Sequence, residues 1–165
     1  MIKVIAFDLF GTVFDHSGVP VEQKREYVRR FTSERYFPMR LPDSWGSIPA
    51  FPDAREGIQL LRTKYKVITC SNWDWHTTRA CLRHNQIEVD GIIDLFDISA
   101  YKPKLITYAY ICDKMQVEPG EVLFVTGNKG GPDNMGGPEK IGMKTILIRH
   151  GWPKDIIELA GEMGC

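Results

Sequence analysis

Short apolar segments alternate with amphipathic, helix-patterned stretches along most of the chain. The apolar segments lie at residues 2–7, 66–70, 92–98, 121–126 and 144–148. Continuous apolar runs of this length are typical of strands that are buried on both faces of a parallel sheet. The run at residues 92–98 is irregular, and we expect it to hold only a short strand. The helix-patterned stretches lie at residues 21–37, 53–65, 75–85, 103–115 and 153–163. Because strands alternate with helices, and crossovers between parallel strands are right-handed, the pattern predicts an α/β fold with a doubly wound parallel sheet.

Three residues mark expected helix starts within this pattern. We expect Asp53 to be the N-cap of its helix, because a carboxylate at that position accepts a hydrogen bond from a free backbone N–H. Pro103 is expected in the first turn of its helix, where its fixed backbone angle suits the conformation. A further helix is expected only after Pro138 and should be very short, since Gly142 follows closely.

Residues 16–50 interrupt the alternation after the first strand. They combine a charged amphipathic stretch, one helix or two, with a loop rich in proline. We expect them to form a small helical insertion over one edge of the sheet. Residues 1–15 and 51–165 would then form the core, and a chain of 165 residues is long enough for one domain of this kind.

The charge balance and the cysteines narrow the possible partners and location. The 21 basic residues balance the 21 acidic ones, so no basic field favours nucleic acid or an anionic membrane. No stretch approaches the length of a membrane span, and the chain runs directly into its first strand. The four cysteines have no CxxC pairing and are expected to be reduced thiols. We therefore expect a cytoplasmic protein that acts on a small substrate, neutral or anionic.

Polar side chains recur where the predicted strands end. Asp8 follows the first strand, Ser71 and Asn72 follow the second, and Asn128 follows the fourth. A carboxylate at the end of a buried strand costs several kcal/mol if it is unpaired, so it is rarely placed there for stability alone. In an open parallel sheet the carboxyl ends of the strands form the ligand-binding edge. Lys102, at a helix start, and Asp133 are expected to join them in one crevice.

The same residues carry a resemblance to a known family. FDLFGTVFD with Asp8, Ser71 after a strand, Lys102 in YKPKLITY and the VTGN loop with Asp133 resemble the four motifs of the haloacid dehalogenase-like hydrolase superfamily, in order and across the chain. Each motif alone is weak, but the combination is specific. The resemblance implies a Rossmann-like core with a cap between the first two motifs. It also implies that Asp8 is a nucleophile that forms a covalent aspartyl intermediate.

The resemblance assigns expected roles to the neighbours of Asp8. Lys102 would keep Asp8 ionised and offset negative charge on the substrate. The anionic group of the substrate would be bound by two hydroxyls and two backbone N–H groups, namely those of Ser71, Thr12, Leu9 and Phe10. Four further side chains are expected at the substrate: Asn72, Tyr108, Thr126 and Asn128. Asp133 would position either the hydrolytic water or Lys102.

Phe10 and Asn128 distinguish between branches of that superfamily. Phosphatases that resemble this chain usually carry an aspartate at the position of Phe10, which moves a proton to the leaving oxygen. Phenylalanine cannot do so, and the loss would be about 10²- to 10⁴-fold in rate. Halide needs no proton to leave, and the dehalogenase branch has an aromatic residue here. Asn128 weakens a magnesium site, yet Asp8, the Phe10 carbonyl and Asp133 could still bind Mg²⁺, so magnesium stays open as a cofactor.

The short insertion argues against the dehalogenase branch. Dehalogenases that resemble these motifs have a larger helical cap, which excludes water and supplies an arginine to the leaving halide. The arginines of the insertion cannot be aligned with that residue, and we interpret them as solvated helix-face charges: Arg29, Arg30, Arg35 and Arg40. An open site would suit a larger substrate or a homo-oligomer that completes the cap.

Three functions therefore remain open from the sequence. The first is a hydrolase of the dehalogenase type that acts on a small carboxylate or another small anion. The second is a magnesium-dependent small-molecule phosphatase whose missing acid–base group is replaced. The third is an inactive relative that binds a ligand or a partner protein.

Overall fold

The computed structural model describes all residues except 34, 37, 39, 128–135 and 150–154. Its centre is a five-stranded sheet in the order β3-β2-β1-β4-β5, and every neighbouring pair is parallel. The strands are β1 (Val4–Phe7), β2 (Lys66–Cys70), β3 (Gly91–Ile93), β4 (Val122–Thr126) and β5 (Lys144–Leu147). The predicted α/β fold with a doubly wound parallel sheet is confirmed.

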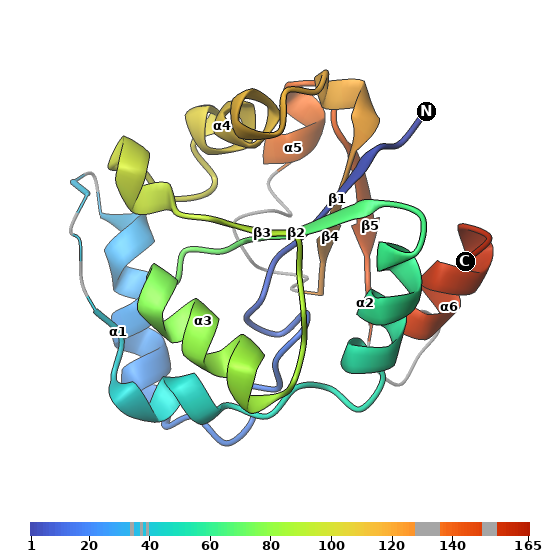
Figure 1. Cartoon of the computed structure of the whole chain (residues 1–165). Helices are drawn as coiled ribbons and strands as arrows, with labels where there is room; N and C mark the ends of the chain where they lie inside the picture. Colours follow the sequence, from blue (N-terminus) through green and yellow to red (C-terminus); the bar gives the residue numbers. More distant parts are fainter. Residues whose placement is uncertain (34, 37, 39, 128–135, 150–154) are drawn as a thin grey trace.

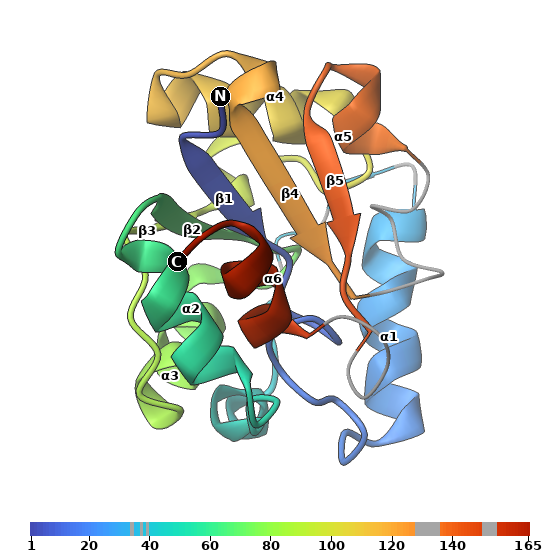
Figure 2. The same ribbon diagram turned by 90° about the vertical axis from the view of Figure 1, so that its right-hand side faces the viewer.

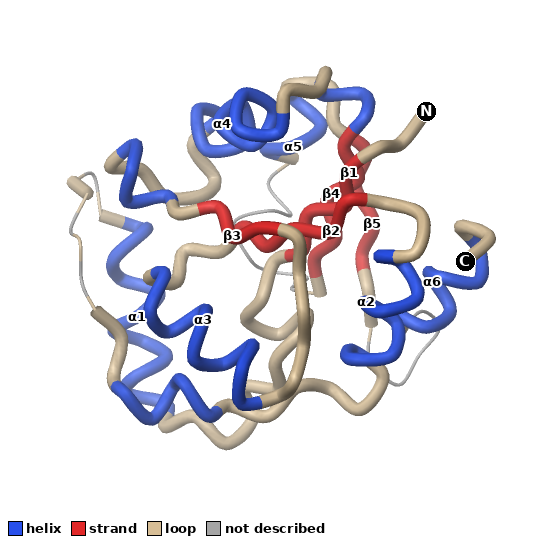
Figure 3. Tube along the Cα trace, in the orientation of Figure 1, coloured by secondary structure: helices blue, strands red, loops and turns tan. Residues whose placement is uncertain are grey.

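The helices cover both faces of this sheet (Figures 1 and 3). They are α1 (Val21–Thr32), α2 (Ala54–Arg62), α3 (Trp75–His84), α4 (Leu105–Met115), α5 (Gly137–Lys140) and α6 (Ile156–Glu162). Helices α4 and α5 lie on one face, whereas α2, α3 and α6 lie on the other. Among the described residues, no helix has the length and apolar character that crossing a membrane requires.

Alternate residues of β1 enter the two cores, as expected for a central strand. Ile5 and Phe7 belong to the cluster under α2 and α6, while Val4 and Ala6 belong to the cluster under α4. The four side chains are almost completely buried. The register pairs Phe7 with Thr69 of β2 and with Val125 of β4, so these three strands end together.

Two of the three expected helix starts differ from the structure, and at the third, Asp53, the helix starts as expected but the capping bond is absent. Asp53 precedes α2, but its side chain does not cap that helix; instead its Oδ2 accepts from the N–H of Ile156 at the start of α6, at 2.6 Å. Pro103 lies in a turn that the Lys104 N–H closes on the Tyr101 carbonyl at 3.1 Å, so α4 begins only at Leu105. Helix α5 begins one residue before Pro138, which occupies its first turn.

The irregular apolar run at residues 92–98 holds only a short strand, as predicted. The strand β3 covers only Gly91–Ile93, and η2 (Leu95–Ile98) takes the rest of the segment. The carboxylate of Asp94 accepts from the N–H of Phe96 at 3.0 Å and caps this short 3-10 helix. A local side-chain bond therefore ends the strand, and an apolar count alone does not reveal it.

Helix α2 packs closely on α6 (Figure 2). A Cβ atom at Gly57 would lie 2.6 Å from Cγ2 of Ile156, so this position of α2 has no room for a larger side chain. Because the two helices pack together, Asp53, directly before α2, lies within reach of Ile156, the first residue of α6.

Residues 16–50 contribute α1 and η1 (Asp43–Ser47) and return to the core beside the first motif. The returning chain pairs with the segment after Thr12: Phe51 N–H donates to Val13 O at 2.9 Å and Asp15 N–H to Pro49 O at 2.8 Å. Asn85, which follows α3, also binds this segment, since its side chain accepts from Ala50 N–H at 2.7 Å. The insertion is therefore tied to the core at its exit, while its boundaries at 16 and 50 stay a prediction.

Candidate active site

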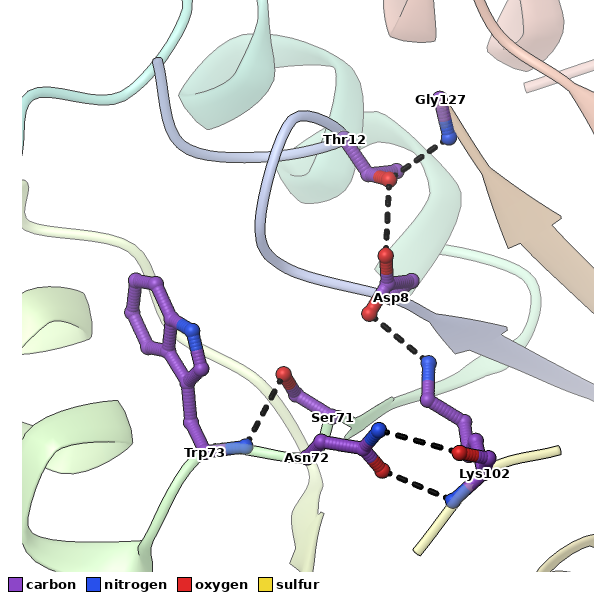
Figure 4. A network of polar contacts seen from close by, with 7 residues as sticks. All are labelled: Asp8, Thr12, Ser71, Asn72, Trp73, Lys102 and Gly127. Atoms are coloured by element: carbon purple, nitrogen blue, oxygen red, sulfur yellow. Dashed lines mark hydrogen bonds and ion pairs between the residues drawn. The ribbon is translucent and has the colours of Figure 1, made fainter. Parts of the chain in front are cut away.

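Asp8 and Lys102 form a buried ion pair at the carboxyl end of β1. The Lys102 Nζ lies 2.8 Å from Oδ1 of Asp8, and only 2% and 8% of the two side chains are exposed (Figure 4). Asp8 is held at the strand end because its N–H donates to Val125 O at 2.9 Å. The two charges come from positions 94 residues apart, so the fold itself assembles the pair. Burial removes competing water and strengthens their attraction.

Asn72 fixes the backbone of Lys102 from the end of β2. Its Oδ1 accepts from Lys102 N–H at 2.8 Å and its Nδ2 donates to the Lys102 carbonyl at 3.2 Å. The amide thus engages both backbone groups of one residue, as Figure 4 shows. This double contact aims the lysine at Asp8, and the predicted binding of substrate by Asn72 stays a prediction.

Thr12 links Asp8 to the end of β4. Its hydroxyl donates to Oδ2 of Asp8 at 3.4 Å and accepts from Gly127 N–H at 2.6 Å. Gly127 has no room for a side chain, because a Cβ atom would collide with the carbonyl oxygen of Gly11. The loop after β1 and the loop after β4 are therefore in direct contact, and each carboxylate oxygen of Asp8 has a donor.

The other predicted site residues lie at or below this edge. Ser71 is buried at the end of β2, where its Oγ accepts from Trp73 N–H at 3.3 Å. Thr126 ends β4 and is also buried. Tyr108 of α4 packs edge-on against Phe124, with ring centroids 5.5 Å apart, in the core on the α4 side of the sheet.

Leu9 shapes the loop that carries the first motif. Its side chain is fully buried, and its carbonyl accepts the backbone N–H groups of Thr12, Val13 and Phe14 at 3.0 to 3.1 Å. These bonds hold the turn that brings Thr12 back to Asp8. The predicted contact of the Leu9 and Phe10 N–H groups with substrate stays a prediction.

Phe10 belongs to an aromatic cluster with His16, Tyr27, Trp45 and Trp73. Its ring stacks on His16 at a centroid distance of 4.3 Å and on Trp45 at 5.2 Å, and Tyr27 and Trp73 pack at 5.0 and 5.9 Å. Burial lowers the pKa of His16, and nearby Lys24 lowers it further, so its ring is neutral at pH 7. The position that bears an aspartate in the phosphatases is therefore part of a mainly apolar contact between the first motif and the insertion.

Two residues of α1 are buried beside this aromatic cluster, one of which, Tyr27, the sequence did not single out. Tyr27 is 6% exposed and Arg30 is 4% exposed, and the guanidinium lies 5.8 Å from the Tyr27 ring centroid. The interpretation of Arg30 as a solvated charge is therefore wrong, whereas Arg29 and Arg40 do lie on the surface in ion pairs. The spacing of three residues that puts Tyr27 and Arg30 on one helix face was the available signal.

Asp74 joins the loop after Ser71 to the insertion. Its carboxylate accepts from Thr77 N–H at 2.9 Å and from Thr77 Oγ1 at 2.7 Å, which caps α3, and from Leu41 N–H at 3.0 Å. Burial alone would raise the pKa of this carboxyl, but the hydrogen bonds from Leu41 and Thr77 outweigh it, and the pKa lies below its ordinary value.

Replacing Asp74 with alanine should lower the free energy of unfolding by about 2–3 kcal/mol at pH 7, because a helix cap and the bond to Leu41 are both lost. A lowered folded-state pKa gives stability that is complete above the unfolded value, near 3.8, and lost as the pH falls through the folded value. The difference in the free energy of unfolding between wild type and variant, measured by urea denaturation, should therefore become smaller below about pH 4. Asp155→Ala, which removes the exposed N-cap of α6, is the matched control and should lower the free energy of unfolding by less than Asp74→Ala does. An equal cost for both variants would contradict this prediction.

The described residues include no group of three or more His, Cys, Asp or Glu side chains close enough to hold a metal ion. Asn128 and Asp133, the two remaining predicted residues, lie outside the described residues. Of the predicted magnesium ligands, Asp8 already binds Lys102 and Thr12 through its two oxygens. Magnesium binding by Asp8, the Phe10 carbonyl and Asp133 stays a prediction.

This geometry suits a nucleophilic carboxylate. Asp8 is held in one orientation by a cation and a hydroxyl, in a site from which water is largely excluded. Fixing a weak nucleophile in line with its target supplies much of the rate that a carboxylate needs.

Comparisons with known proteins agree with the fold and the motifs. A family model described as haloacid dehalogenase-like hydrolase matches residues 22–126, which include Ser71 and Lys102. The (S)-2-haloacid dehalogenase 4A of Burkholderia cepacia is 32% identical over 120 residues, which cover 70% of this chain and 51% of that protein. The chain thus spans about half the length of the curated relatives it matches.

Solved structures show the same fold. An L-2-haloacid dehalogenase superposes with a TM-score of 0.82 at 16% identity, over 99% of both chains. The L-2-haloacid dehalogenase of Xanthobacter autotrophicus with chloropropionic acid covalently bound gives a TM-score of 0.73 at 22% identity, over 90% of this chain and 78% of that one. From its family match, its curated relatives and its fold, the chain belongs to the haloacid dehalogenase-like hydrolase family.

Proposed function

We propose that this chain is a hydrolase of the dehalogenase type that releases halide from a small 2-haloacid through Asp8. The observation that carries this proposal is the environment of Phe10. Its ring is stacked on His16 and Trp45 of the insertion, so that position offers no group that protonates a leaving oxygen. Halide leaves as a stable anion and needs no proton, and the site therefore suits halide better than alkoxide or phenoxide.

The first step forms one bond and breaks one. An Asp8 carboxylate oxygen attacks C2 of the haloacid, the carbon–halogen bond breaks, and the halide leaves with the bonding electron pair. The product of this step is an ester between Asp8 and the 2-carbon of the acid. Lys102 and Thr12 hold the carboxylate in place for the attack.

The second step restores the carboxylate. Water attacks the carbonyl carbon of the Asp8 ester, the ester bond breaks, and the 2-hydroxy acid leaves with one proton released. Asp133 is our expected partner for this water. Lys102 offsets the negative charge on the ester oxygen as the attack proceeds.

Binding of the substrate needs donors for its carboxylate and a cation for its halide. We assign the carboxylate to Ser71 and to the N–H groups of Leu9 and Phe10. Arg30 is the cation we assign to the leaving halide, since it is the arginine of the insertion that is buried beside the site. The printed names of the curated relatives favour the (S)-2-haloacids as the enantiomer used.

A comparison of products tests this function. Purified protein is incubated with (S)-2-chloropropionate, with (R)-2-chloropropionate and with an aryl phosphate, each with and without Mg²⁺. We expect chloride release from the (S) acid that does not depend on Mg²⁺. Phosphate release alone, dependent on Mg²⁺, would contradict the proposal in favour of a phosphatase, and turnover of none of the three would favour a binding role.

A further inference from the structure

The indole N–H of Trp73 is a buried hydrogen-bond donor beside the candidate active site. Only 2% of Trp73 is exposed, and its Nε1 has no hydrogen-bond partner among the residues that the structure describes. Buried donors of this kind are rare in folded proteins, because each loses its hydrogen bonds to water without a replacement. The indole N–H of Trp73 is therefore a candidate donor for an acceptor that the substrate supplies.

The direction of this donor is fixed by its neighbours. The backbone N–H of Trp73 donates to Ser71 Oγ at 3.3 Å, and the indole lies parallel to the Phe14 ring, with centroids 5.7 Å apart and an interplanar angle of 7°. A parallel ring covers the face of the indole and cannot accept its in-plane N–H. Figure 4 shows Nε1 on the side of the indole that faces Ser71 and Asp8.

Trp45 provides a contrast within the same aromatic cluster. It is 1% exposed, and its ring centroid lies 5.7 Å from that of Trp73. Its Nε1 donates to Oε1 of Gln23 at 2.7 Å, so α1 supplies an acceptor for this indole. Of these two neighbouring buried tryptophans, one has its acceptor within the described residues and the other does not. The difference singles out Trp73 as the donor available to a ligand.

A 2-haloacid brings two possible acceptors, its carboxylate and its halogen. The carboxylate already has assigned donors in the loops after β1 and β2. The indole of Trp73 is surrounded by the rings of Phe10, Phe14 and Trp45, which suit a halogen bound to carbon. The halogen gains negative charge only as the carbon–halogen bond breaks. A fixed donor at the halogen therefore stabilises the transition state more than the bound substrate.

We propose that Trp73 is a further catalytic residue, whose indole N–H donates a hydrogen bond to the halide as it leaves. This inference rests on the proposed function for the identity of the leaving group. The halide takes the bonding electron pair, and Trp73 keeps its proton throughout. Trp73 adds an uncharged donor to the positive charge of Arg30, which we also assign to the halide.

Trp73→Phe tests the proposal because it keeps an aromatic ring against Phe14 and removes the N–H. The rate of halide release from (S)-2-chloropropionate in a single turnover should fall by about 10- to 100-fold, the effect of a hydrogen bond to a charged group. The KM should change less than about 3-fold, because the bond acts mainly in the transition state. Circular dichroism and Tm report whether the variant folds.

Trp75→Phe is the matched control for this substitution. The ring of Trp75 contacts the His76 ring at 5.3 Å and the Arg79 guanidinium at 4.9 Å, on the outer part of α3. The single-turnover rate of this variant should stay within about 2-fold of wild type.

A measurement on the wild type observes the donor directly. The chain has four tryptophans, so its indole N–H resonances in a ¹H–¹⁵N spectrum are few and can be assigned from single Trp→Phe variants. If Trp73→Phe does not fold, its resonance is assigned by elimination. Sodium bromide should shift the Trp73 resonance saturably, relative to sodium sulfate at equal ionic strength. The Trp45 resonance should shift much less, because its N–H is already bonded to Gln23.

Three results would overturn the inference. The first is a Trp73 resonance that bromide moves no more than that of Trp45, and the second is a folded Trp73→Phe variant with the wild-type single-turnover rate. The third is a resonance that propionate shifts and bromide does not, which would assign Trp73 to the carboxylate. The proposed function fails separately, if the wild type releases no halide. In that case a saturable shift by bromide would still support a halide site at Trp73.

Discussion

Asp8→Asn should lower halide release by at least about 10⁴-fold, because an amide cannot act as the nucleophile and the ester intermediate cannot form. The asparagine keeps the size of the aspartate and can still contact Thr12, so the fold should be retained. Initial rates with (S)-2-chloropropionate, at protein concentrations high enough to detect residual activity, measure the effect.

The control for this variant is the same substitution in a different place. Asp97→Asn removes a surface carboxylate that pairs with Lys114 at 3.5 Å, and its activity should stay within about 2-fold of wild type. If Asp8→Asn keeps more than a few per cent of the wild-type rate, Asp8 is not the nucleophile, and the account of the site is wrong.

Lys102→Met should lower the free energy of unfolding by about 3–5 kcal/mol, because it leaves the Asp8 carboxylate buried without its cation. Asp8→Asn should also lower the free energy of unfolding, because it leaves the Lys102 ammonium buried without its anion. The double variant Asp8→Asn/Lys102→Met removes both charges, so its loss should be clearly smaller than the sum of the two single losses. Urea denaturation of the four proteins measures this coupling.

An ion pair nearer the surface, between Arg62 and Asp90, is the matched comparison for the buried pair of Asp8 and Lys102. Arg62 pairs with Asp90 at 3.2 Å, and each side chain is about a quarter exposed. The cycle Arg62→Met and Asp90→Asn should give a coupling of at most about 1 kcal/mol. Strict additivity at Asp8 and Lys102 would show that the two charges are not coupled, and would contradict the geometry of the site.

The sheet was predictable because most residues of its strands are apolar. Buried parallel strands such as β1 and β4 show continuous apolar runs, which few other elements of this length show. The register places their carboxyl ends together, so the polar residues that follow them were expected at one edge. Asp8 met this expectation because its position depends on the strand that it follows. Lys102 reaches the same edge from the loop before α4, where Asn72 holds its backbone.

The contribution of α1 was not predictable in the same way. Tyr27 lies on the apolar stripe of an amphipathic helix, and such a stripe looks alike whether it packs on core side chains or on a site. Arg30 lies one turn further on the same face, beside arginines that are solvated. Which of these charges is buried depends on how α1 packs against Phe10 and Trp45, and that is a long-range contact.

The helix starts show a similar limit. Asp53 has the right type and position for an N-cap, but its carboxylate binds the N–H of Ile156 instead, about a hundred residues away in sequence. Local propensity predicted a local bond, and tertiary packing of α6 against α2 supplied a different donor. Pro103 likewise lies in a turn, directly after the lysine that binds Asp8, and α4 begins two residues later.

The most direct test of the central claim follows the oxygen atom of the first turnover. Protein in excess over (S)-2-chloropropionate is mixed in water labelled with heavy oxygen, and the peptide that contains Asp8 is examined by mass spectrometry together with the product. If Asp8 forms the ester, the 2-hydroxy acid takes its new oxygen from Asp8, and the label appears in the Asp8 carboxylate. Label that appears directly in the hydroxyl of the product, with none in Asp8, would contradict the account, because water and not Asp8 would then have displaced the halide.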